Sequence, residues 1–324
     1  MELLNYKSDD DKQEYFYHST VNNVTCFKEL INSFNNDKKP ILYRGVNNKN
    51  YRMYSSIQRE FLTSNNTSNV SLEDVIRQIL FDFKKNKVLM NALSHQLPDQ
   101  THITDYSILA FIQHYGGPTP LLDFTSNLST ALFFAFDGRE DDNYASLYIV
   151  PKSKFIFGEI GAIYNSGYEA IQKQIEEIRK KHPQYIIDTS IVESKILEMI
   201  FNPKFEGVLV FGGTESFRTF GGNNFAIANY NIWAQDGYFI QGACSCKPLD
   251  ESLIERIHCH CDKWNYIDKQ IRSWCIDISP GIIDELRTLY KVPNNREHIY
   301  SSFPELSEIQ NEIFSLKKKF FQHN

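Results

Sequence analysis

Residues 112–136, IQHYGGPTPLLDFTSNLSTALFFAF, place glycines, prolines and polar residues between two strongly apolar runs. The first run predicts the last turns of a helix ending at Gly116, because glycine readily takes the left-handed conformation that follows a helix. Residues 119–125 then predict a strand, and Ser126 or Asn127 predicts the cap of a second, very apolar helix. The polar residues that connect these apolar elements are therefore expected to lie in the interior of the fold.

The polar residues of this stretch form a first candidate site. Asp123 and Thr125 share one face of the predicted strand, and Ser126 lies at its junction with the next helix. The amides and positive dipole at a helix N-terminus favour an anionic or polar ligand. The alternative is structural: Asp123 pairs with a core arginine, and Ser126 only caps the helix. His114, at a helix C-terminus, is by itself more often structural than catalytic.

The composition excludes several classes of protein. The 324-residue chain can form one large domain or two small ones. Its hydrophobic content of 42% supports a core, and its net charge of −6 argues against nonspecific binding to nucleic acid or anionic membranes. The acidic start lacks a secretory signal, and no run of about 18 apolar residues predicts a transmembrane helix. We therefore expect a cytoplasmic protein without a membrane partner.

Helical and extended patterns mix along the chain without a regular βαβ alternation. This mixture predicts an α+β fold, with mixed central sheets and flanking helices. Residues 1–24 are expected to be a leader, and residues 25–320 a single domain with a helical insertion at about 160–205. Within the domain, Ser71 is predicted to open one continuous helix that runs to about Leu93.

Two further polar residues interrupt apolar strands. Arg44 ends the predicted strand ILYRG beside Gly45, which is expected to leave open backbone space. Its guanidinium could grip a phosphate or carboxylate, or form a structural ion pair. Residues 231–242 predict an extended strand with Gln235 and Phe239 on one face. A buried glutamine needs hydrogen-bond partners, either a substrate hydroxyl or a backbone loop.

Four of the six cysteines form two Cys-x-Cys pairs, at Cys244, Cys246, Cys259 and Cys261. Zinc sites usually separate paired cysteines by two to four residues, which lets the chain curl around the metal. One intervening residue instead puts both thiols on one face of a strand. We expect reduced thiols on neighbouring strands and no metal, with structural zinc as the alternative.

Taken together, these segments resemble the FRG domain, a bacterial and phage-associated family. The motif that names the family is Tyr43–Gly45 here, and QHYGGPTPLLDFT is similar to the family's Gln-His-x-Gly-x-Pro-Thr-x-Leu-Leu-Asp-aromatic-Thr run. The segment AQDGYF resembles a Gln-x-Gly-x-Phe motif, and further blocks extend the resemblance over residues 25–320. Two positions depart from the family pattern: Val46 replaces a polar residue, and Pro120 stands where arginine is common.

The order of these motifs is similar to that of ADP-ribosyltransferases, which implies a cleft between two small sheets that binds NAD as substrate. By this similarity, Arg44 would bind the pyrophosphate or ribose, and Gln235 would hold the hydroxyls of the nicotinamide ribose. Thr125 and Ser126 would support the nicotinamide pocket. The implied catalytic residues are Arg44, His114, Asp123 and Gln235, and the implied NAD-binding residues are Arg44, Gly45, Tyr115, Thr125 and Ser126.

The resemblance implies an NAD-dependent ADP-ribosyltransferase that acts as a toxin or phage-defence effector. Its acceptor would be a protein, a nucleic acid or a small molecule, and a regulatory or antitoxin partner would control it. A glutamine cannot act as a general base, so proton removal from the acceptor would fall to His114, Asp123 or Asp236.

Two other functions compete with ADP-ribose transfer. A noncatalytic module would use the same pocket to sense a nucleotide or a phage component, and both Gln235 and Pro120 favour this alternative. A hydrolase built on His114 and Asp123 is weaker, because no established hydrolase motif accompanies these two residues.

Overall fold

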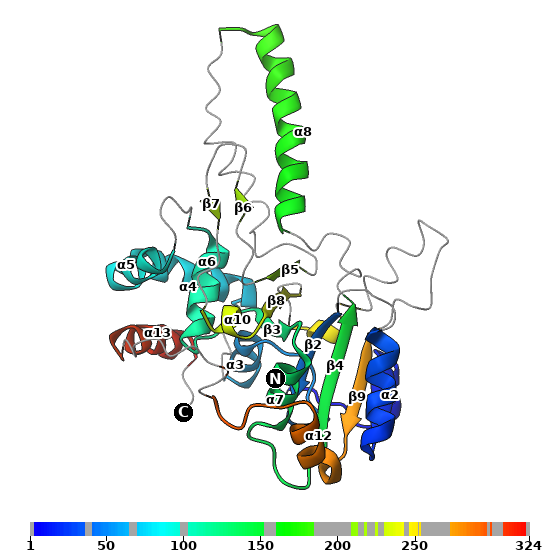
Figure 1. Ribbon diagram of the computed structural model, residues 1–324. Coiled ribbons are helices and arrows are strands. Elements are labelled where there is room, and N and C mark those ends of the chain that lie inside the picture. Colours follow the sequence, from blue (N-terminus) through cyan, green and yellow to red (C-terminus); the bar gives the residue numbers. More distant parts are fainter. Residues whose placement is uncertain are drawn as a thin grey trace.

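A seven-stranded mixed sheet runs through the centre of the protein in the computed structural model (Figure 1). The structure describes residues 3–35, 41–64, 70–97, 103–151, 160–184, 209–212, 217–218, 224–225, 230–242, 246–251, 253, 273–296, 299 and 307–321. Helices flank the sheet, which agrees with the predicted mixture of helices and strands.

The strands lie in the order β1-β9-β4-β2-β3-β8-β5. β1 is parallel to β9, and the other neighbouring strands are antiparallel. Their bounds are β1 Tyr17–Val21, β2 Ile41–Val46, β3 Leu121–Thr125, β4 Ala145–Pro151, β5 Leu209–Gly212, β8 Gly237–Gln241 and β9 Trp274–Ile278. β6 (Phe217–Arg218) and β7 (Asn224–Phe225) form a separate pair.

The joint between β2 and β3 is the weakest connection in the sheet. These strands share one residue pair, Tyr43 with Thr125. By contrast, β2 pairs with β4 along its whole length from Ile41 to Val46, and β3 pairs with β8 from Leu121 to Thr125. The sheet therefore consists of two well-paired parts that meet at a single point.

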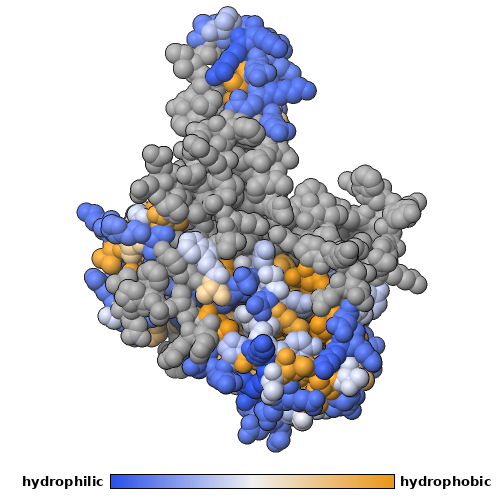
Figure 2. Space-filling model, viewed as in Figure 1, coloured by the Kyte–Doolittle hydropathy of each residue, from blue (hydrophilic) through white to orange (hydrophobic). Residues whose placement is uncertain are grey.

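The helices are α1 Asp9–Gln13, α2 Val24–Asn35, α3 Ser56–Thr63, α4 Leu72–Lys85, α5 Lys87–Gln96, α6 Asp105–His114, α7 Leu128–Phe136, α8 Ile160–Lys181, α10 Tyr230–Ala234, α12 Ile283–Leu289 and α13 Ser307–Phe320, with a 3₁₀ turn, η3, at Pro280–Ile282. Within the described chain, no helix combines the length and the apolar character that a membrane span requires. α8 projects from the rest of the fold, and Figure 2 shows mainly hydrophilic side chains over its described end.

Alternation along the strands separates two apolar layers. Tyr43 and Leu147 face α2, α7 and α12, whereas Leu42 and Tyr148 face the opposite layer, which Phe16 helps to fill. A third apolar layer joins α4, α5, α6 and α13 to the part of the sheet formed by β3 and β8. These layers hold both parts of the sheet from the sides, although the strands at the joint share only one pair.

Local capping confirms the helix starts predicted at Ser71 and before residue 128, and corrects the length of one helix. Asn127, rather than Ser126, caps α7, because its side chain accepts a hydrogen bond from the amide of Thr130. The predicted single helix from Ser71 is two helices, α4 and α5. Asn86 divides them. Its main-chain N–H bonds to the last turn of α4, and its side chain caps the start of α5.

The predicted strand over residues 231–242 is wrong in its first half. Tyr230–Ala234 forms the helix α10, Asp236 has a φ of 48°, and only Gly237–Gln241 is extended. The β-forming residues of this stretch suggested a strand, but tertiary packing overrides such a preference. Ile232 of α10 packs against Gly237, where an added Cβ would lie 2.9 Å from the Ile232 carbonyl oxygen.

The segment predicted as a leader, residues 1–24, contributes to the central sheet. It contains α1 and β1, and β1 pairs with β9 from Tyr17 to Val21. The polar composition of this segment gave no sign that it would join the sheet. One of its buried side chains is the charged Lys12. The limits of the predicted domain and insertion remain predictions, and residues 185–205 lie outside the described chain.

Candidate functional site

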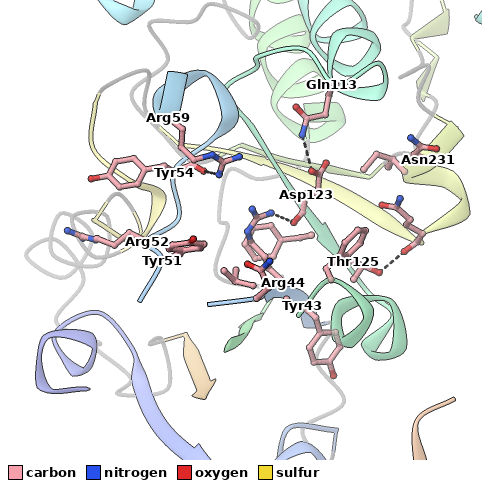
Figure 3. A pocket seen from close by; sticks show the side chains of 18 of the residues that line it. Tyr43, Arg44, Tyr51, Arg52, Tyr54, Arg59, Gln113, Asp123, Thr125 and Asn231 are labelled. Carbon is pink, nitrogen blue, oxygen red and sulfur yellow. Dashed lines mark hydrogen bonds between the residues drawn. The ribbon is translucent and has the colours of Figure 1, made fainter. Parts of the chain in front are cut away.

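A cavity of about 740 Å³ lies beside the joint of β2 and β3 (Figure 3). The structure brings together the predicted site residues Arg44, Gly45, His114, Asp123, Thr125 and Gln235 around this cavity. Two other predicted site residues, Tyr115 and Ser126, are not among the residues that line it. Sequence positions nearly two hundred residues apart therefore meet at one place in the fold, and their individual roles stay predictions.

Arg44 presents a positive charge that the protein balances incompletely. Its Nη1 donates to the main-chain carbonyl of Asp123 at 2.6 Å, and its Nε is buried without a hydrogen-bond partner within the described chain. Burial lowers the pKa of Arg44 to about 10, and nearby Arg59 adds to this effect while Asp123 opposes it. The carbonyl is neutral and the nearby Asp123 carboxylate offsets the charge only in part, so an anionic ligand would stabilise this guanidinium.

Two more arginines line the cavity, and they differ in their partners. Arg59, on α3, donates from Nη1 to the carbonyl of Tyr54 at 2.8 Å. Arg52 instead forms ion pairs with the carboxylates of Asp250 at 2.7 Å and Glu251 at 3.1 Å. Figure 3 shows the Arg52 side chain directed away from Arg44. The charge of Arg52 is therefore balanced within the protein.

Asp123 is the one carboxylate among the described residues that line the cavity. Its Oδ2 accepts a hydrogen bond from Gln113 Nε2 at 2.9 Å. Burial raises the pKa of Asp123, although Arg44, the bond from Gln113 and Arg59 all act in the opposite direction. A carboxyl group of raised pKa in a cationic cavity can hold or accept a proton more readily than an exposed aspartate.

Thr125 and Gln235 line the cavity while they fasten neighbouring segments together. The Thr125 hydroxyl donates to the main-chain carbonyl of Gln235 at 2.6 Å, and the Gln235 amide donates to the carbonyl of Ile299 at 3.3 Å. Ser126, outside the cavity, donates through its hydroxyl to the carbonyl of Asp236 at 3.3 Å. These bonds connect the end of β3 to the turn between α10 and β8.

The remaining predicted residues have clear packing roles. Tyr115 accepts a hydrogen bond at its hydroxyl from Gln96 at 2.9 Å, and its ring packs against Phe111. Gly45 lines the cavity, but the expected open space beside it does not exist. A Cβ at this position would lie 1.8 Å from the carbonyl oxygen of Ala131 in α7. Glycine is needed there so that α7 can approach β2 closely.

Among the polar residues that line the cavity, Arg52, Arg59 and Gln113 were not assigned a role from the sequence. The arginines lie in a loop and a helix where charged residues are ordinary, so neither interrupts an apolar pattern. One local sequence pattern near Arg59 could have been recognised. Ser55 and Gln58 form a capping box that fixes the start of α3, and this start sets the direction of Arg59.

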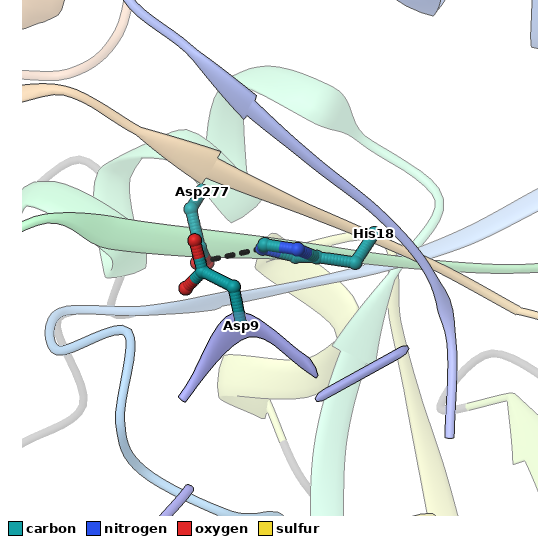
Figure 4. A group of neighbouring side chains, drawn as sticks. All are labelled: Asp9, His18 and Asp277. Atoms are coloured by element: carbon teal, nitrogen blue, oxygen red, sulfur yellow. Dashed lines mark hydrogen bonds and ion pairs between the residues drawn. The ribbon is translucent and has the colours of Figure 1, made fainter. Parts of the chain in front are cut away.

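A second cluster of polar residues lies on the opposite part of the sheet, around Asp277 (Figure 4). Asp9, His18 and Asp277 have the spacing of a cation site. However, the Lys12 ammonium already lies 2.6 and 2.8 Å from the two carboxylate oxygens of Asp277. This lysine supplies the positive charge that a metal would supply, so Asp277 belongs to a buried ion-pair network, whereas the more exposed Asp9 pairs with Lys49.

The cysteine pairs cannot be compared with their prediction. Cys246 is half-buried, whereas Cys244, Cys259 and Cys261 lie outside the described residues. The expected reduced, metal-free state of these thiols therefore stays a prediction.

The fold and the cavity define a protein with a mixed, mostly antiparallel sheet, flanking helices and a cationic pocket beside the joint of β2 and β3. Residues 39–144 match the family model of the FRG domain. This match covers β2, β3 and most of the cavity wall, including Arg44, His114, Asp123 and Thr125, and it ends before Gln235. Comparison with curated proteins and with solved structures gave no match.

Proposed function

We propose that the cavity binds NAD and that the protein transfers the ADP-ribose group of NAD to an acceptor. The observation that carries the proposal is the incompletely balanced charge of Arg44, whose hydrogen-bond partner within the described residues is a neutral carbonyl. Arg59 adds a second guanidinium with a neutral carbonyl partner. Two such groups beside a single carboxylate favour a ligand that carries phosphate.

The size and lining of the cavity support a nucleotide as this ligand. Its volume of about 740 Å³ lies within the range of small-molecule sites. Arg44 and Arg59 would bind the diphosphate. The exposed Tyr51 also lines the cavity, and its ring is available to stack against a base.

Transfer breaks the bond between nicotinamide and its ribose through an oxocarbenium-like state, which fixed charges and dipoles stabilise. The order of the motifs that contain Arg44, Thr125 and Gln235 supports this reaction. The acceptor would be a protein, a nucleic acid or a small molecule. In this proposal the protein is a toxin or phage-defence effector, and a regulatory or antitoxin partner restrains it.

A noncatalytic sensor of a nucleotide or phage component is the second candidate, and one observation favours it. The Thr125 hydroxyl and the Gln235 amide, which would serve the nicotinamide end, both donate to main-chain carbonyls. A cavity of this kind can bind phosphate without supporting the chemistry at the ribose.

The two candidates separate in one experiment. Calorimetric titration with NAD measures binding, and chromatography of the same mixture measures released nicotinamide. We expect both binding and release. Binding without release would favour the sensor instead, whereas the absence of NAD binding would contradict the transferase.

Arg44→Lys is expected to weaken NAD binding by about 10- to 100-fold, because one charge-assisted hydrogen bond contributes about 1–3 kcal/mol. The melting temperature should change little, because within the described residues Arg44 bonds to a main-chain carbonyl and forms no ion pair that the change would break. Calorimetry and thermal unfolding of the variant measure the two effects.

Arg52→Lys is the matched control, since Arg52 lines the same cavity but is held by Asp250 and Glu251. It should lower the melting temperature and leave NAD affinity nearly unchanged. If Arg44→Lys behaves like this control, Arg44 is a structural residue and its proposed role in binding is wrong.

A further inference from the structure

A chain of hydrogen bonds leads from the buried core to the cavity and ends at Asp123. The Thr119 hydroxyl donates to Oε1 of Gln113, and Gln113 Nε2 donates to Asp123 Oδ2 at 2.9 Å. Thr119 is completely buried and does not line the cavity. It can therefore influence a ligand only through the residues that it contacts.

The donors and acceptors in this series of hydrogen bonds have fixed directions. The Thr119 oxygen accepts a hydrogen bond from the amide of Leu121 at 3.3 Å, so its single proton is directed to Gln113. The Gln113 side chain must then present its oxygen to Thr119 and its NH₂ group to Asp123. This orientation makes the bonded oxygen of Asp123 an acceptor and favours the ionised carboxylate.

The surroundings of Asp123 suit a group that exchanges protons. Burial raises its pKa, while Arg44, Gln113 and Arg59 keep this rise limited. The main-chain carbonyl of Asp123 also holds the Arg44 guanidinium at 2.6 Å, so this residue fixes the main cation of the cavity as well. The titratable or charged residues that share the cavity with Asp123 are Tyr43, Arg44, Tyr51, Arg52, Tyr54, Arg59 and His114.

We infer that Asp123 is the proton acceptor of the proposed transfer reaction, and that Gln113 and Thr119 are positioning residues that act through it. This inference rests on the proposed function. The bond between ribose C1′ and nicotinamide breaks, and its electron pair leaves with nicotinamide. An O–H or N–H group of the acceptor forms the new bond to C1′, and its proton passes to the Asp123 carboxylate and then to water.

The structure favours Asp123 over one of the two other predicted bases. Asp236 is exposed and does not line the cavity, so it is less suited than Asp123 to act on a ligand bound there. His114 does line the cavity, and experiment must distinguish it from Asp123.

Asp123→Asn is the first test. NAD affinity should be kept or increased, because a negative charge near the phosphates is removed, while nicotinamide release should fall by at least about 100-fold, within the usual contribution of a general base. His114→Gln is the matched variant from the same cavity. If it abolishes release while Asp123→Asn does not, His114 is the base and the inference is overturned.

Thr119→Val tests the positioning role without touching the cavity. Loss of the hydroxyl frees the Gln113 amide to rotate, which removes a bond that favours the ionised carboxylate. The acid limb of kcat/KM for nicotinamide release should then move to higher pH by about 0.5 to 1 unit. Gln113→Met, which lacks the amide donor, should shift the limb in the same direction.

Thr119→Ser keeps the hydroxyl and should restore the wild-type limb. NMR titration of the Asp123 carboxyl group should rank the midpoints of wild type, Thr119→Val and Thr119→Ser in the same order as the kinetic limbs. This measurement does not depend on turnover. Wild-type protein that releases nicotinamide with unshifted limbs and midpoints in Thr119→Val would overturn the positioning role and leave the proposed function intact. Wild-type protein that binds NAD without releasing nicotinamide would overturn both the proposed reaction and the role of Asp123 in it.

Discussion

Gly45→Ala is expected to lower the free energy of unfolding by about 3 kcal/mol or more, at the upper end of the usual overpacking penalty. The added Cβ would lie 1.8 Å from the carbonyl oxygen of Ala131 and 2.5 Å from the amide nitrogen of Ala135. Both are backbone atoms of α7, so no side-chain rotation relieves the clash. Relief requires α7 to move away from β2, which would open the apolar layer that both elements share.

Urea unfolding of the purified variant measures this loss. Gly281→Ala is the matched control, because its Cβ would meet no atom closer than 3.9 Å. The control should stay within about 1 kcal/mol of the wild type or become slightly more stable. Equal stability of the two variants would show that α7 does not approach β2 as closely as the structure has it.

This close approach changes the interpretation of the Arg-Gly pair. The sequence suggested that Gly45 leaves room for a ligand beside Arg44. In the structure that room is filled by α7, and the glycine serves the packing of the helix on the strand. A glycine next to a functional residue looks the same in the sequence whether a ligand or a helix backbone approaches it, since both need the absence of a Cβ.

The local elements were largely predictable from short-range chemistry. Ser71 with Asp74 and the polar connection before α7 mark helix starts through side-chain bonds within a few residues. The single pair that joins β2 to β3, Tyr43 with Thr125, was not predictable. It depends on how helices pack from both sides on strands that are far apart in the sequence. No local pattern records such an arrangement.

Local sequence patterns also revealed only part of the candidate site. Arg44 and Asp123 could be singled out because each interrupts an apolar strand, where an unexplained polar residue is conspicuous. Arg59 was missed because it lies on a helix with ordinary exposed charges. Gln235 lines the cavity as predicted, yet it lies in a turn after α10, because the extended pattern of its neighbours was misleading.

A buried ion-pair network attaches the N-terminal segment to the sheet, on the far side from the cavity joint. The side chains of Lys12 and Asp277 are only 2% and 0% exposed, and their charged atoms lie 2.6 Å apart. His18 and Ser146 also contact the Asp277 carboxylate, His18 at 2.8 Å. Elements from the start, middle and end of the chain therefore meet at one carboxylate.

Asp277→Asn is expected to lower the free energy of unfolding by about 3–5 kcal/mol, because it leaves the Lys12 ammonium buried without a balancing charge. Lys12→Met should have a comparable effect, since it leaves the carboxylate unbalanced. The double variant removes both charges, so its loss should be smaller than the sum of the single losses by about 1–3 kcal/mol. Urea unfolding of the four proteins gives this coupling directly, and simple additivity would mean that the pair contributes nothing specific.

The same network predicts how stability depends on pH. Burial alone would raise the pKa of Asp277, but the bond with His18 and the charge of Lys12 outweigh it and lower the pKa below the usual 3.8. A carboxyl whose pKa is lower in the folded state contributes stability above its unfolded pKa and loses it as pH falls through the folded value. The difference in the free energy of unfolding between wild type and Asp277→Asn should therefore be largest at neutral pH and begin to decrease only below about pH 4. A gap that stays constant through this acid range would show that Asp277 acts by packing, and that its charge does not hold β1 to the sheet.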